Sequence, residues 1–216
     1  MVQYSGPNSQ QVQDRFNVSW YHALLSEGII VVAVDGRGTA ARGAVFRKGT
    51  YLRLGMQESD DQIAAARYLA TLPYVDGNRI GIWGWSYGGY NVLMSMSRGD
   101  GIFKAGVAIA PVTDWRFYDT VYTERFMRTP GQNHEGYMQG SPLELASQLQ
   151  GRLLLIHGTA DDNVHLQNAI EYSRALIRAN KHFEMFYFPD YDHSIVGDNA
   201  REYLYEKVIH FFRERL

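Results

Sequence analysis

The sequence predicts a single α/β domain, residues 1–216, built on a mostly parallel sheet with helices on both faces. Three observations lead to this fold class. Short apolar runs alternate with segments of helical spacing along the whole chain. No repeat or low-complexity linker divides the 216 residues, which suffice for one sizeable core. Finally, the apolar run 79–83 passes through a glycine-rich turn directly into a helical segment.

The first third of the chain is expected to contain two helices and two strands. In order, we predict a strand end at 1–4, a helix over 13–26, a buried parallel strand over 29–34, an excursion over 39–55 and a helix from 59 to 73. Gly28 is placed to cap the first helix, and Ser59 or Asp60 to begin the second.

The rest of the chain continues the alternation, with one interruption. We predict strands over 79–83, 105–110, 153–156 and 183–188, and helices over 91–96, 141–149, 166–179 and 199–213. Residues 112–140 interrupt this rhythm, because they are rich in aromatic rings and poor in aliphatic side chains. Parallel sheets of this kind hold their sites at the carboxyl ends of the strands.

Composition excludes several classes of function. The chain is 45% hydrophobic and 20% charged, with a net charge of −2, so neither nucleic acid nor an anionic membrane is an expected partner. It has no cysteine, which excludes disulfides and thiolate metal sites. We find no signal peptide and no apolar run long enough to span a membrane.

The turn at 84–88 carries the strongest chemical signal. It has the pattern Gly-x-Ser-x-Gly with Ser86 at its centre, between a predicted strand and a predicted helix. This context favours the nucleophile elbow of α/β-hydrolases over an ordinary glycine-rich turn. Glycines are needed there because side chains would collide with neighbouring elements, and the turn lifts the serine above the amino end of a helix.

A serine nucleophile needs a histidine base and a carboxylate that orients it. In this fold the chain order is serine, carboxylate, histidine. Asp161 and Asp162 follow a late strand, and His193 alone among the seven histidines follows the last strand. Spacing does not decide between the two aspartates. A metal site at His157 and these aspartates is a weaker alternative.

These motifs together resemble the catalytic domain of the prolyl oligopeptidase family of serine peptidases, in its dipeptidyl peptidase IV branch. The matching stretches are 4–7, 35–38, 61–67, 84–90, 110–112, 118–125, 157–164 and 192–193. The resemblance implies that Ser86 is the nucleophile, His193 the base and Asp161 the orienting carboxylate. It also implies an oxyanion hole made by the Tyr4 hydroxyl and the Tyr87 backbone N–H.

The resemblance further implies a pocket for a proline or alanine side chain and contacts to the bound peptide. The residues it assigns to substrate binding are Tyr87, Val112, Trp115, Tyr118, Tyr122, Arg125, Asn163 and Val164. A proline ring is apolar and lacks an N–H, so aromatic walls suit it. Without the resemblance, ordinary core packing would be the favoured interpretation of these rings.

The expected function is therefore hydrolysis of peptide bonds after proline or alanine through an acyl-enzyme, without cofactor or metal. The resemblance implies release of N-terminal dipeptides in a longer protein whose N-terminal β-propeller is missing here, together with the first strands of the domain. It points to a periplasmic or extracellular location and allows a homodimer. The alternatives are a small carboxylesterase of the same fold, and a fragment whose intact site has no activity alone.

Overall fold

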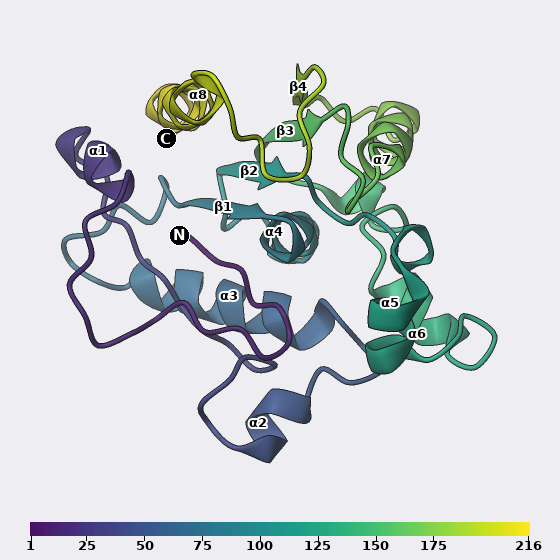
Figure 1. Ribbon diagram of the computed structural model, residues 1–216. Coiled ribbons are helices and arrows are strands. Elements are labelled where there is room, and N and C mark those ends of the chain that lie inside the picture. Colours follow the sequence, from purple (N-terminus) through teal and green to yellow (C-terminus); the bar gives the residue numbers. More distant parts are fainter.

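A four-stranded parallel sheet forms the centre of the computed structural model, which describes residues 1–216. The strands are ordered β1-β2-β3-β4 across the sheet (Figure 1). Their bounds are Gly81–Trp85 for β1, Ala105–Ile109 for β2, Arg152–Gly158 for β3 and Glu184–Phe188 for β4. Every pair is parallel, as predicted, so the residues that follow the strands emerge at one edge of the sheet.

Helices cover both faces of the sheet, and each layer encloses its own apolar core (Figure 1). On one face lie α1 (Tyr21–Ser26) and α8 (Ala200–Arg215). On the other lie α3 (Met56–Leu69), α4 (Tyr87–Arg98) and α7 (Gln167–Arg178). The β2 strand is buried on both faces, which explains its continuous apolar sequence. None of the helices combines the length and apolar character needed to cross a bilayer.

The predicted irregular stretch 112–140 contains local helices. These are η1 (Trp115–Phe117), α5 (Thr120–Met127) and α6 (His134–Gln139). A further short helix, α2 (Ala44–Lys48), lies in the excursion predicted over 39–55. Each of η1, α5 and α6 begins at a polar side chain, Asp114, Asp119 or Asn133, that accepts a backbone hydrogen bond. Capping by these residues compensates for the weak apolar periodicity of the stretch.

The helix predicted over 141–149 is wrong, because only a 3-10 turn forms there, η2 (Ala146–Gln148). The backbone bonds within the segment, such as that from the Leu145 N–H to the Pro142 carbonyl oxygen, span three residues rather than the four of an α-helix. Two further bonds tie the segment to residue 113. The Leu143 N–H and the Ser141 hydroxyl both donate to the Thr113 carbonyl oxygen.

The strand predicted over 29–34 is also wrong in the described structure. Val2 forms isolated parallel bridges with Ala33 on one side and Trp83 of β1 on the other. The segment has no second neighbour, and Ile30 is 53% exposed. A backbone paired at one point does not form a ladder, although its apolar sequence suits one.

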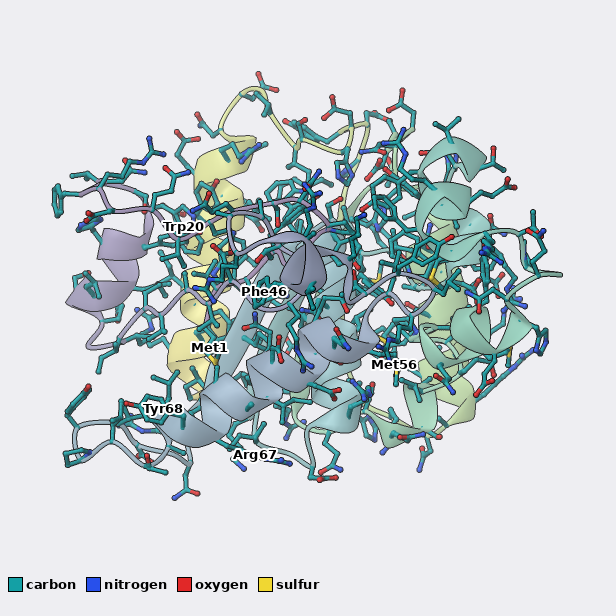
Figure 2. All side chains as sticks on the ribbon, turned by 90° about the horizontal axis from the view of Figure 1, so that it is seen from below. Met1, Trp20, Phe46, Met56, Arg67 and Tyr68 are labelled. Atoms are coloured by element: carbon teal, nitrogen blue, oxygen red, sulfur yellow. The ribbon has the colours of Figure 1, made fainter.

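Two helix starts differ from the sequence prediction. The helix predicted from residue 13 begins only at Tyr21, and just before the predicted start Asp35 accepts the backbone N–H groups of Gln11 and Val12. The helix predicted from residue 59 begins at Met56, ahead of the predicted caps Ser59 and Asp60. Figure 2 shows Met56 at one end of α3, near α5 and α6, and Arg67 and Tyr68 at the other.

Candidate active site

Ser86 is the single residue between the end of β1 and the start of α4. Its backbone has φ 58° and ψ −120°, a conformation that residues other than glycine rarely adopt. A Cβ on Gly84 would lie 2.7 Å from the Gln3 carbonyl oxygen, and one on Gly88 only 2.5 Å from the same atom. The elbow glycines are therefore required by close backbone packing, and the strain at Ser86 is held by its surroundings.

The Ser86 hydroxyl has no hydrogen-bond partner within the chain, His193 included, and the residue is only half-buried. Tyr87, the first residue of α4, has no intrahelical partner for its N–H. This N–H lies beside the serine at the amino end of a helix, so it can donate a hydrogen bond to a substrate oxygen on which negative charge develops.

Asp161 follows β3 and lies against His193. Its Oδ2 is 2.7 Å from His193 Nδ1, and its Oδ1 accepts the N–H groups of Asn163 and Val164 at 3.0 and 2.8 Å. Burial alone would raise the pKa of Asp161, but hydrogen bonds from His157 and His193 hold that pKa well below its usual range. Asp162 is exposed and faces none of these groups.

His193 lies in the loop between β4 and α8, and this loop is tied to the elbow. The indole N–H of Trp85, the residue before Ser86, donates to the His193 carbonyl oxygen at 3.0 Å. A Cβ on Gly158, at the end of β3, would collide with the Tyr191 carbonyl oxygen. Sequence reasoning missed both positioning contacts, although Trp85 stands inside the motif that it singled out.

His157 is a second histidine at the carboxylate. It is fully buried, with Nε2 2.7 Å from the Val164 carbonyl oxygen and 3.3 Å from Asp161 Oδ2. It lies on β3, four residues before Asp161. No group of three or more histidine, aspartate or glutamate side chains is placed to hold a metal ion.

Most residues predicted to bind substrate gather in one aromatic cluster. The Trp115 and Tyr122 rings stack at 5.9 Å, and Tyr118 stands nearly perpendicular to both, at 6.0 and 5.4 Å. Buried Val112 and Val164 belong to the same cluster. These side chains come from β3, α4, η1 and α5 or the segments beside them, so tertiary structure alone brings them together.

The polar residues predicted around this cluster occupy different environments. The Tyr4 ring lies 6.0 Å from the Tyr87 ring, and burial raises the pKa of the Tyr4 phenol. Asn163 Oδ1 accepts a hydrogen bond from the Tyr118 hydroxyl at 2.8 Å. Arg125 is exposed on α5 and makes no ion pair within the chain.

Comparison with known proteins identifies the family of the chain. The model of the prolyl oligopeptidase family matches residues 16–216. A probable dipeptidyl-aminopeptidase B of Grosmannia clavigera is 48% identical over 95% of this chain, and dipeptidyl peptidase 4 of Sus scrofa is 43% identical over 98%. The chain spans only 22% and 28% of those two proteins.

Among solved structures, dipeptidyl peptidase 4 of Porphyromonas gingivalis superposes with a TM-score of 0.98 and 60% identity. The match covers 100% of this chain and 31% of that one. Fold and comparisons together define a serine peptidase domain with the α/β-hydrolase fold, which confirms the predicted fold class. The chain belongs to the prolyl oligopeptidase family, and its relatives are dipeptidyl peptidases of the IV and B types.

Proposed function

We propose that this chain hydrolyses peptide bonds after proline or alanine, with Ser86, His193 and Asp161 as its catalytic triad. The observation that carries the proposal is the 2.7 Å contact between Asp161 and His193. The backbone of His193 is in turn bonded to Trp85, the residue before the serine in the strained elbow. In the longer protein, a further N-terminal domain would bind the substrate's amino terminus, so that dipeptides are released.

The triad chemistry follows from the hydrogen bond at the His193 ring. With Nδ1–H donated to Asp161, Nε2 carries no proton and can accept the one from Ser86. The serine oxygen then attacks the peptide carbonyl, and the imidazolium donates its proton to the departing amine. Water then attacks the acyl-enzyme carbonyl while His193 accepts a proton from it. His193 returns this proton to the Ser86 oxygen as the ester bond breaks.

The Tyr4 hydroxyl and the Tyr87 N–H are proposed to stabilise the tetrahedral oxyanion. The Tyr4 phenol is protonated at neutral pH, and burial moves its pKa further above the ordinary value, so its hydroxyl can donate a hydrogen bond to the oxyanion. The aromatic cluster supports the proposed preference, because its apolar rings suit a proline ring, which has no N–H to donate.

A fluorophosphonate probe tests the chemistry directly. We expect labelling of Ser86, located by mass spectrometry, and none in the Ser86→Ala variant. A folded wild-type chain that stays unlabelled would contradict the triad assignment. Parallel assays with Gly-Pro-p-nitroanilide and a short-chain ester test specificity. Ester turnover without anilide cleavage favours the carboxylesterase alternative, and labelling without any turnover favours a fragment that is inactive alone.

A further inference from the structure

Two buried polar residues on α3 face the proposed oxyanion hole. Glu58 and Gln62 are one helical turn apart, and both side chains have no exposed surface. Burying a carboxyl group and an amide in one apolar layer is costly unless their contacts compensate. Their contacts lead to the two residues proposed as oxyanion donors.

Glu58 contacts the first of these donors. Its Oε1 accepts a hydrogen bond from the Tyr87 hydroxyl at 2.6 Å, and its Oε2 has no partner. The Tyr87 phenol is therefore held at its far end, while its backbone N–H lies beside Ser86. Fixing the ring limits how the first turn of α4 can move.

Gln62 reaches the residues on either side of Tyr4. Its Nε2 lies 3.2 Å from Ser5 Oγ, and Ser5 in turn donates to Gln3 Oε1 at 3.2 Å. The Gln3 side chain also donates to the Gly88 carbonyl oxygen in α4. Ser5 has φ 64°, so this network holds a strained backbone directly after Tyr4.

The geometry points to α3 as the element that positions both oxyanion donors, Tyr87 through Glu58 and Tyr4 through Gln62 and Ser5. This inference rests on the proposed function. Burial raises the pKa of Glu58 to about 7, so near neutral pH the carboxyl and the Tyr87 phenol share one hydrogen bond in which either group can donate. Glu58 and Gln62 are positioning residues, since neither touches the reacting atoms.

The test uses two readouts that do not require turnover. The first is the rate of Ser86 labelling by a fluorophosphonate. The second is the affinity for a Gly-boroPro boronate, whose tetrahedral adduct places an oxygen between the two donors. The reference is binding of the product dipeptide Gly-Pro, which forms no such adduct. A change in the pocket itself would alter the affinity for Gly-Pro, whereas a change in the oxyanion donors would not.

We expect Glu58→Leu, Tyr87→Phe and Gln62→Met each to slow labelling and weaken boronate binding about tenfold. Gly-Pro binding should stay unchanged in Glu58→Leu and Gln62→Met, which alter no predicted pocket residue. The double variant Glu58→Leu with Tyr87→Phe should lose no more than either single one, because both remove the same contact. Glu58→Gln keeps the acceptor and should retain most of the rate. Tyr68→Ala, at the exposed far end of α3 (Figure 2), should behave as the wild type.

Folded variants that label and bind the boronate at wild-type levels would overturn the inference, as would additive losses in the double variant. Thermal melts establish folding, and if Glu58→Leu does not fold, Gln62→Met and Tyr87→Phe decide. A wild-type chain that resists labelling would instead overturn the proposed function, so the two failures are distinguishable.

Discussion

At the scale of single residues, the adjacent aspartates Asp161 and Asp162 lie in different environments. The Asp161 carboxylate contacts four donor groups: two are backbone N–H groups and two are histidine rings. Asp162 is exposed to water. The contrast offers a matched pair of substitutions, because a change at either position alters the charge equally.

For Asp161→Asn we expect kcat to fall by about 10⁴, since the amide no longer selects the His193 tautomer with a free Nε2. Asp162→Asn should stay within about twofold of the wild type, as expected for an exposed group without a role in the site. Steady-state kinetics on Gly-Pro-p-nitroanilide measures both. Equal losses in the two variants would show that overall charge, not the hydrogen bond to His193, is what matters.

Glu58 makes a prediction about stability. Its pKa rises from 4.5 to about 7 on folding, so between these values the native state keeps a proton that the unfolded chain releases. The free energy of unfolding therefore falls as pH increases through this window, by about 3 kcal/mol at ~1.4 kcal/mol per pKa unit. Urea melts of Glu58→Gln should show a stability gain relative to the wild type that grows from pH 4.5 to 7. Parallel pH curves for the two proteins would contradict it.

At the scale of elements, the loop that carries His193 depends on contacts with β1. The Trp85 indole N–H holds the His193 backbone, and the Arg201 guanidinium of α8 covers the Trp85 ring at 4.7 Å. Arg201 also donates to the Ile195 carbonyl oxygen in the same loop. The ends of two elements thus fix a segment that has little regular structure of its own.

We expect Trp85→Phe to lower kcat/KM about fivefold, because it removes one hydrogen bond worth roughly 1 kcal/mol while keeping an aromatic ring. The control is Trp83→Phe, which removes a buried indole N–H that has no partner. Kinetics and thermal melts of both variants separate loop positioning from loss of packing. A greater kinetic loss in folded Trp83→Phe than in Trp85→Phe would argue against a role for this tether.

At the scale of the whole molecule, the segment 29–32 borders a cavity of about 240 Å³ that is lined mainly by apolar residues. Its other lining residues include Trp83 of β1 and Phe212 of α8. None of the residues proposed for the triad or the aromatic cluster lines this cavity, so the site and the cavity are separate features of the molecule.

The local chemistry of this protein was readable in the sequence, because it depends on residues that are neighbours along the chain. The turn around Ser86 identified the elbow, and the order of strands and helices predicted a parallel α/β sheet that the structure and the comparisons confirm. The resemblance selected Asp161 over Asp162, a choice that spacing alone left open. The catalytic roles of Asp161 and His193 stay predictions, which the proposed experiments test.

Only the tertiary structure decided which distant groups meet. The strand expected over 29–34 needs a continuous ladder with a neighbouring strand, and its own apolar sequence cannot supply one. The link from Trp85 to His193 spans 108 residues, and the network from Gln62 to Ser5 spans 57. Contacts between residues so far apart follow from packing geometry, which side-chain periodicity does not encode, so the supports of the site became visible only in the folded chain.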